Sequence, residues 1–155
     1  MLKWKVHTIL VLTIFSFGID SVPARTIQEA RQAIVRSTMD YLSIPYLWGG
    51  TNPQTGLDCS GFVQLVYHRA GFGVPRVSGD QFRLTAYLGP TSVREADLIF
   101  FSMKNPSSRR VDHVGIYVGK GYFVHASFSN GIHIDNVNNR YYYERIVGIR
   151  KFPGF

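Results

Sequence analysis

The sequence predicts an α+β fold in which N-terminal helices pack on one small antiparallel β-sheet. Two observations support this prediction. Apolar residues recur at helical spacing in two segments, 27–43 and 59–70, whereas short strand-like runs dominate from residue 96 onward. Strands that follow the helices in one block, instead of alternating with them, are typical of an α+β domain.

The first helix is predicted over residues 27–43. Thr26 and Glu29 have the spacing of a capping box, and Pro45 ends the helical pattern. The apolar positions at near-helical spacing are Ile27, Ala30, Ile34 and Met39. This spacing supports the helix assignment.

A turn-rich loop, PYLWGGTNPQTGLD at residues 45–58, precedes the second predicted helix. This helix covers residues 59–70, with Asp58 as its N-cap and Gly71 as its stop. Cys59, the only cysteine of the chain, is therefore expected at the first helical position.

The remainder of the chain changes from helical to strand-like periodicity. A loop that leads into a short helix is predicted at 73–83. The strands are predicted at residues 96–102, 111–119, 121–128, 131–136 and 145–152, with glycine, asparagine and proline between them. A tight turn at 119–121 should join the second and third strands into a hairpin.

The composition fits a single globular domain over residues 25–155. The chain has 155 residues, 45% of them hydrophobic, which is enough for one core and short for two. The net charge is +7, but the arginines are scattered, whereas a nucleic-acid-binding protein more often has a basic face interleaved with aromatic residues. Diffuse positive charge suits attraction to a polyanionic cell envelope instead.

Residues 1–24 differ from the rest and predict a secretory signal peptide. Two lysines precede an apolar run over 6–19, and Val22 and Ala24 are placed like the small residues before a signal-peptidase cut. The run is shorter than the roughly 20 residues that span a bilayer. We therefore expect cleavage after Ala24, no membrane span in the mature chain, and a periplasmic or secreted protein.

Cys59 is a candidate nucleophile. A lone thiol in an exported protein is paired between molecules, buried and inert, or reactive. A helix N-terminus favours the reactive thiolate, because unpaired N–H groups and the helix dipole point at it. The thiol also needs a histidine to take its proton and return it to a leaving amine.

Two histidines on the predicted hairpin could supply this base. His113 alternates with the apolar residues of its strand and should face away from them, beside Gly115, while His125 lies on the next strand. One ring could act as the base and the other could hold it in the required tautomer. His68 and His133 are interpreted as exposed residues of a helix and a strand.

Six motifs occur in the order seen in the NlpC/P60 family of cell-wall cysteine peptidases: PYLWGG, LDCSGF, VPRVSGDQF, ADLIFF, DHVGIYVG and FVHAS. The chain resembles this family over about residues 30–150. The resemblance implies a papain-like fold and a lone catalytic domain that needs no metal or organic cofactor. It also implies hydrolysis of amide bonds in peptidoglycan stem peptides, often between D-glutamate and a diamino acid.

The resemblance also implies roles for individual residues. Cys59 would be the nucleophile, His113 the general base and acid, and His125 the residue that orients His113. Tyr46 would help to stabilise the oxyanion, unless it is only a packing aromatic. The positions that match the lining of the substrate cleft are Asp58, Ser60, Arg76, Ser78 and Gln81; Asp58 could equally serve only as the N-cap.

The sequence departs from the family pattern at two places. Ala96 stands where the family usually has glycine before the aspartate of the ADLIFF motif. A basic loop, MKNPSSRR at residues 103–110, precedes the strand of His113. This loop could bias the charge preference of the site or be an ordinary solvated loop.

Other functions remain open at this stage. The same triad could serve an N-acetylmuramoyl-L-alanine amidase, an acyltransferase or an antibacterial effector. In a different class, Cys59, His113 and His125 could hold a zinc ion with an open fourth position, although no paired ligand spacing supports this. A catalytically silent wall-binding domain is the remaining alternative.

Overall fold

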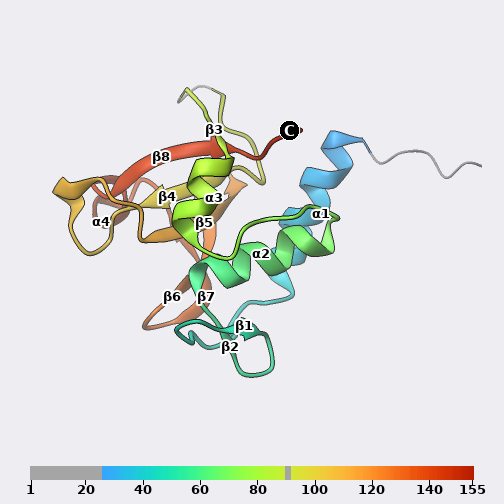
Figure 1. The fold of residues 1–155 in the computed structure, drawn as a ribbon, viewed down its shortest axis with the longest axis horizontal. Helices are drawn as coiled ribbons and strands as arrows, with labels where there is room; N and C mark the ends of the chain where they lie inside the picture. The colour runs from blue at the N-terminus through green and yellow to red at the C-terminus, as the bar shows by residue number, and fades with distance from the viewer. Residues whose placement is uncertain (1–25, 90–91) are drawn as a thin grey trace, which may run out of the picture.

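The computed structural model describes residues 26–89 and 92–155 of the chain, so the predicted signal peptide lies outside the described residues (Figure 1). The helices are α1 (Ile27–Met39), α2 (Cys59–Arg69), α3 (Ser78–Leu84) and α4 (Arg140–Tyr143). The strands of the main sheet are β3 (Ala86–Tyr87), β4 (Leu98–Phe101), β5 (His113–Gly119), β6 (Tyr122–Ser127), β7 (Gly131–Asn136) and β8 (Ile146–Lys151). This architecture confirms the predicted α+β fold.

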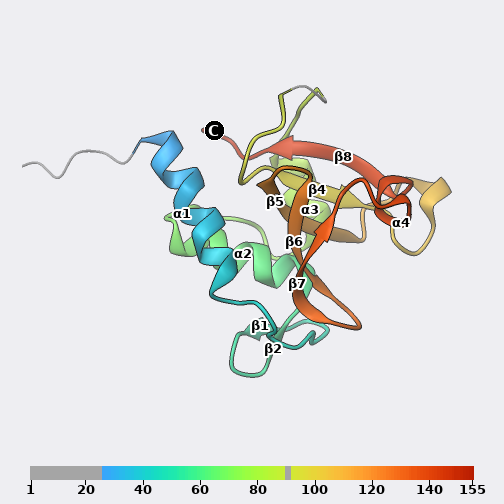
Figure 2. The same ribbon diagram turned by 180° about the vertical axis from the view of Figure 1, so that it is seen from behind.

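The main sheet has the order β3-β8-β4-β5-β6-β7, and every neighbouring pair is antiparallel. A second, two-stranded sheet of β1 (Thr51–Asn52) and β2 (Gly56–Leu57) lies in the loop before α2. Helices α1 and α2 lie together beside the sheet, and α2 packs against β5 and β6 (Figures 1 and 2). This packing brings the start of α2 to the strands that carry the two histidines.

None of the helices in the described part of the chain has the length and apolar character of a membrane span.

Strand β4 is buried on both faces, which explains its continuous apolar sequence LIFF. Leu98 and Phe100 belong to the core shared with α1 and α2, whereas Ile99 and Phe101 pack in a second cluster with Tyr142 of α4. A strand covered on both sides loses the alternation that marks a half-exposed strand. Helix α4, which the sequence analysis did not predict, provides part of this second cover.

Helix α1 begins as predicted, but only part of its apolar pattern is buried. The Thr26–Glu29 capping box is present. Ala30 and Ile34 are buried, whereas Ile27 and Met39 are 55% and 40% exposed. The buried residues of the helix are Ala30, Arg31, Ile34 and Thr38. The helix also ends at Met39, earlier than predicted, because the chain turns over residues 40–43.

The buried face of α1 is set by an ion pair. Arg31 Nη1 donates to Asp97 Oδ1 at 2.8 Å and to the Glu95 carbonyl oxygen at 2.6 Å, and both charged side chains are at most 5% exposed. Asp97 also accepts from the Arg94 N–H at 2.7 Å. The preceding residue, Ala96, has a left-handed φ of 65°, which accounts for a glycine being the usual residue at this position.

We predict that Arg31→Met strongly destabilises the protein. The change leaves the Asp97 carboxylate buried without its cation, and breaking a buried pair in this way costs about 3–5 kcal/mol. The free energy of unfolding in urea measures the loss. Arg83→Met, which removes one partner of the exposed Arg83–Asp80 pair, is the control and should cost less than about 1 kcal/mol. Equal losses in the two variants would contradict this account.

Candidate active site

The start of α2 is held by the carboxylate of Asp58. Asp58 Oδ1 accepts from the Gly61 N–H at 2.7 Å, and Oδ2 accepts from the Gly49 N–H at 3.1 Å. A Cβ on Gly61 would lie 2.3 Å from the Gly50 carbonyl oxygen, so only glycine lets the loop approach the helix this closely. Cys59 is the first residue of α2, as predicted, and it is buried, with 8% of its surface exposed.

The Cys59 thiol is neutral in the free protein. Burial and the negative charge of Asp58 raise its pKa to about 11, against the N–H groups of Val114, Ser60 and Cys59 itself, which lower it. The expected effect of the helix N-terminus on the thiol is therefore only one of several contributions to its pKa. The backbone N–H groups act in the expected direction, but desolvation outweighs them. A base must remove the proton for Cys59 to become a nucleophile.

His113 and His125 form a hydrogen-bonded pair, and the predicted hairpin geometry is confirmed. His113 Nε2 lies 2.7 Å from His125 Nδ1, across strands β5 and β6. A Cβ on Gly115 would lie 2.7 Å from a carbon of the Phe123 ring and 3.2 Å from the His125 Cβ. The glycine beside His113 therefore leaves the space that Phe123 and the second ring occupy.

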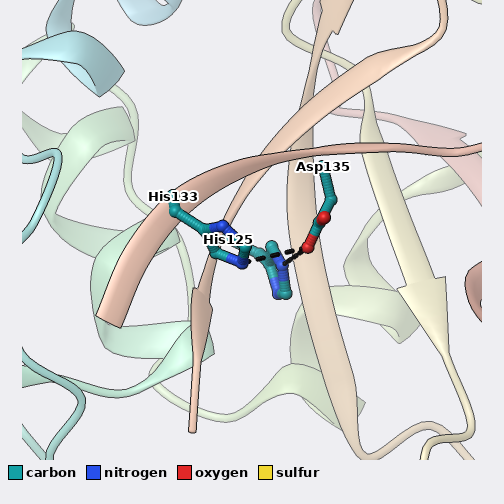
Figure 3. Close-up of side chains that lie close together, drawn as sticks. All are labelled: His125, His133 and Asp135. Atoms are coloured by element: carbon teal, nitrogen blue, oxygen red, sulfur yellow. Dashed lines mark hydrogen bonds and ion pairs between the residues drawn. The ribbon is translucent and has the colours of Figure 1, made fainter. Parts of the chain in front are cut away.

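Asp135 of β7 extends this pair and was missed by the sequence analysis. Its Oδ2 atom lies 2.9 Å from His125 Nε2 (Figure 3). The same oxygen also accepts a hydrogen bond from the Tyr142 hydroxyl. The pKa of Asp135 lies below its usual value, because the hydrogen bonds from His125 and Tyr142 outweigh the effect of burial. The carboxylate is thus ionised near neutral pH and can only accept.

The chain of hydrogen bonds determines the tautomers of both histidines. Because Asp135 only accepts, His125 Nε2 carries a proton, which leaves a lone pair on His125 Nδ1 in the neutral ring. His113 Nε2 then donates to that lone pair, and the neutral His113 ring keeps a lone pair on its own Nδ1. Burial lowers the pKa of His113 to about 3 and also lowers the pKa of His125. Both rings are therefore neutral at pH 7.

His133 lies beside the same cluster and is not the solvent-facing residue that the sequence suggested. Its side chain is 28% exposed, it pairs with His125 across β6 and β7, and its Nε2 atom lies 3.0 Å from Asp135 Oδ2. The alternation of GIHIDN places His133 and Asp135 on one face of β7. This spacing was the signal that could have revealed the cluster. His68 is exposed on α2, as predicted.

A cleft of about 580 Å³ lies over the histidine pair. Its lining includes Tyr46, Trp48, Lys104, His113 and His125. The pKa of Tyr46 is raised by burial first, and the charges of a Cys59 thiolate and of Asp58 also raise it, so its hydroxyl lies near the start of α2. The Tyr46 ring also packs on Phe128 at 5.5 Å between centroids. Tyr46 is thus both a packing aromatic and a polar group at the cleft.

The basic loop 103–110 borders the cleft. Lys104 Nζ lies 5.6 Å from the centre of the exposed Trp48 ring. A second hollow of about 520 Å³ shares Trp48 and Lys104 with the first and is also lined by Ser78 and Arg110. The two hollows adjoin at these shared residues and together are called the groove; Lys104 and Arg110 are basic residues of its lining, and Asp112 is an acidic one.

The five residues expected to line the substrate cleft fall into two groups. Arg76 donates to both oxygens of Asp58, at 2.9 and 2.6 Å, and to Ser60 Oγ at 3.0 Å. Gln81 is fully buried and donates to the Ser60 carbonyl oxygen at 3.0 Å. Ser78 lines the second hollow, and the Arg76 side chain is 33% exposed. Asp58, Ser60 and Gln81 are buried and contact the loop and helix around Cys59.

The structure brings together some of the predicted site residues and separates others. In residues 26–89 and 92–155, no hydrogen bond joins the Cys59 sulfur to either histidine; the sulfur instead faces the N–H of Val114, the residue after His113. The three-ligand cluster within these ranges is His125, His133 and Asp135. Cys59, His113 and His125 do not gather their ligand atoms as the zinc alternative required.

A buried thiol at a helix start, beside an antiparallel sheet that carries a histidine pair, defines a papain-like domain. The chain belongs to the NlpC/P60 family, whose model matches residues 43–151, more than half of its length. The structure resembles that of an NLP/P60 family protein, "similar to lipoprotein", from Staphylococcus aureus Mu50, with a TM-score of 0.73 and 34% identity over 85% of this chain and 44% of that one. A family member from Bacillus cereus ATCC 10987 gives a TM-score of 0.73 with 31% identity, over 79% and 40% of the two chains.

Curated relatives are named as hydrolases and endopeptidases. Gamma-DL-glutamyl hydrolase of Bacillus subtilis is 34% identical over 120 residues, which are 77% of this chain and 29% of the relative. Murein DD-endopeptidase MepH of Escherichia coli is 29% identical over 152 residues, which are 96% of this chain and 55% of the relative. Across the curated relatives that it matches, the chain spans between about a fifth and about a half of their length.

We predict that His113 makes the protein less stable at acidic pH. The unfolded chain binds a proton on this histidine below a pKa of about 6.5, whereas the folded protein binds it only near pH 3. The unfolded state therefore gains protons first, and stability falls as the pH drops from 6.5. Urea unfolding at pH 7 and pH 5 should show a smaller loss for His113→Asn than for the wild type, by up to about 2 kcal/mol.

The matched control for this experiment is His68→Asn on the exposed side of α2. This variant should keep the wild-type dependence on pH. If His113→Asn also loses as much stability as the wild type between pH 7 and pH 5, the histidine is not held neutral by the fold.

Proposed function

We propose that the protein is a cysteine peptidase that hydrolyses amide bonds in the stem peptides of peptidoglycan. The observation that carries this proposal is the hydrogen-bonded chain His113–His125–Asp135 beside a buried thiol at the start of α2. Family membership supports the substrate class, as do relatives named as a murein DD-endopeptidase and a bifunctional muramidase/DL-endopeptidase. This reaction requires a nucleophile, a base and a hydrogen-bond donor to the oxyanion.

The tautomers of the histidine pair support His113 as the base. Its free lone pair on Nδ1 accepts the proton of the Cys59 thiol as sulfur attacks the scissile carbonyl carbon. The same proton then passes from Nδ1 to the departing amine, which leaves a thioester on Cys59. A water molecule that gives its proton to Nδ1 attacks the thioester, and the proton returns to sulfur as the acid product leaves.

Because the Cys59 thiol and the His113 ring are both buried, we place the proton transfer between them in the complex with substrate. The free protein holds a neutral thiol and a neutral imidazole, so no charged pair has to be stabilised before the substrate arrives. Proton-transfer contacts that are absent in a free enzyme commonly form in its substrate complex. Negative charge that develops on the substrate oxygen would be met by the Cys59 N–H and the Tyr46 hydroxyl.

The groove supplies the contacts to the peptide. We propose that Ser78 and the exposed part of Arg76 contact the stem peptide, while Asp58, Ser60 and Gln81 position these groups and Cys59. Lys104 and Arg110 along the groove suit a substrate that carries carboxylates, because stem peptides contain D-glutamate. We further propose that the scissile bond joins D-glutamate to the diamino acid, in a protein exported by the signal peptide at residues 1–24.

We predict that Cys59→Ala abolishes hydrolysis of defined muropeptides. Loss of a catalytic nucleophile removes the covalent route and should lower kcat by at least about 10³-fold. Product masses from the wild type identify the bond that is cut. Cleavage after D-glutamate supports the proposed specificity, whereas release of the entire stem peptide from the sugar would indicate an amidase. Turnover retained by the Cys59→Ala protein would refute the cysteine mechanism.

We also predict that Asp135 positions the histidine pair, which the variant Asp135→Ala tests. Asp135→Ala removes the acceptor that holds the proton on His125 Nε2, so the wrong tautomer of His113 becomes accessible. We expect kcat to fall about 10- to 100-fold with little change in KM, because the groove contacts are intact. Asp135→Asn, whose amide oxygen can accept the same hydrogen bond, should recover part of the loss. An Asp135→Ala protein with wild-type kcat would remove Asp135 from the mechanism.

A further inference from the structure

His125, His133 and Asp135 place three metal-ligating atoms at one point of the sheet. His125 Nε2 and His133 Nε2 lie 2.9 and 3.0 Å from the same Asp135 oxygen, and all three atoms are within 4.8 Å of one another (Figure 3). Ligands of a tetrahedral zinc ion with bonds of 2.0–2.1 Å are about 3.3 Å apart. The two distances to Asp135 Oδ2 are therefore within a few tenths of an ångström of the separation that zinc requires.

Two features distinguish this cluster from an ordinary hydrogen-bond network. His133 Nε2 is buried and makes no hydrogen bond, although it lies close to Asp135 Oδ2. Asp135 Oδ2 in turn is approached by three groups, because the Tyr142 hydroxyl donates to it as well. A buried ring nitrogen that makes no hydrogen bond, 3.0 Å from a shared carboxylate oxygen, is an arrangement that a cation would satisfy.

The cluster is also partly exposed to solvent. Strand β7 is the last strand of the sheet, and the side chains of His133 and Asp135 are 28% and 22% exposed, whereas His125 is 2% exposed. Parts of two of the three ligand residues are therefore open to solvent at the edge of the sheet, whereas the ligand atoms His133 Nε2 and His125 Nε2 lie beneath the surface. Two imidazoles and one carboxylate form a set that favours zinc and similar divalent transition metals over magnesium or calcium.

We propose that His125, His133 and Asp135 form a binding site for Zn²⁺ that switches off the active site. The binding half of this proposal is independent of the proposed function, whereas the inhibitory half rests on it. His125 is the shared residue, because it faces the metal site with Nε2 and His113 with Nδ1.

The inhibition follows from the histidine tautomers. A metal at His125 Nε2 takes the position of the proton there, and the neutral ring then carries its proton on Nδ1. His125 Nδ1 now donates to His113 Nε2, so the proton of His113 resides on its own Nδ1. One proton leaves His125 Nε2 and one is gained at His113 Nδ1, so the charge of the two rings is unchanged. His113 loses the lone pair that accepts the Cys59 proton, and attack on the substrate stops.

Binding is tested first on the full-length Cys59→Ala protein, which removes the thiol as a ligand. Titration with Zn²⁺ against a competing chelator should give one site per chain, and His133→Gln in the same background should weaken that site by at least about tenfold. With Co²⁺ as a spectroscopic probe, the protein that retains Cys59 should show ligand-field bands without a thiolate charge-transfer band. A thiolate band, or binding unaffected by His133→Gln, would overturn the proposed ligands.

Inhibition is tested on muropeptide hydrolysis by the full-length chain. Zn²⁺ should abolish turnover by the wild type, and a chelator should restore it. His133→Gln leaves the metal-free activity unchanged and should shift the inhibitory Zn²⁺ concentration upward by at least about tenfold. Equal inhibition of both proteins would mean that zinc acts elsewhere, and would overturn the switch. If neither protein cleaves muropeptides without metal, the proposed function fails, while the binding titration still decides the site.

Discussion

The carboxylate of Asp58 is the contact on which the rest of the site depends. It caps α2 through Gly61, holds the glycine loop through Gly49, and pairs with Arg76 from the segment before α3. Three parts of the chain are thereby fixed around the first residue of one helix. Because α2 packs on β5 and β6, the position of Cys59 relative to the histidine strands follows from the same contact. The cap is thus a structural element and a source of negative charge beside the thiol.

Burial gives this site a resting state without charged reactants. Desolvation raises the pKa of the thiol and lowers the pKa of His113, so each group would have to gain charge in the low-dielectric interior to form an ion pair. Asp135 resolves the resulting ambiguity between tautomers, because a carboxylate can only accept. A single residue on β7 thereby determines which nitrogen of His113 has a lone pair, two hydrogen bonds away. The same dependence makes His125 Nε2 a point where a bound cation could control the reaction.

Several parts of the fold and site were predictable because their causes are local. The capping residues before α1 and α2 satisfy N–H groups within three positions of themselves, and the alternation in DHVGIYVG places His113 opposite the valines. The buried face of α1 was not predictable in this way. Ile27 and Met39 belong to the apolar pattern of the helix but are exposed, whereas the Arg31–Asp97 ion pair places a charged residue inside. A partner 66 positions away along the chain leaves no local signal.

The sequence by itself determined that the chain is an α+β domain, that its thiol begins a helix and that two histidines share a hairpin. These features depend on short-range periodicity, capping and turn residues. Only the tertiary structure decided that Asp135, His133 and Tyr142 surround His125, and that burial keeps the thiol neutral. The registry between β6 and β7 and the packing of α4 on the sheet bring those groups together. The pKa shifts caused by burial likewise depend on all the residues that pack around the thiol. The residues next to it in the sequence therefore do not reveal these shifts.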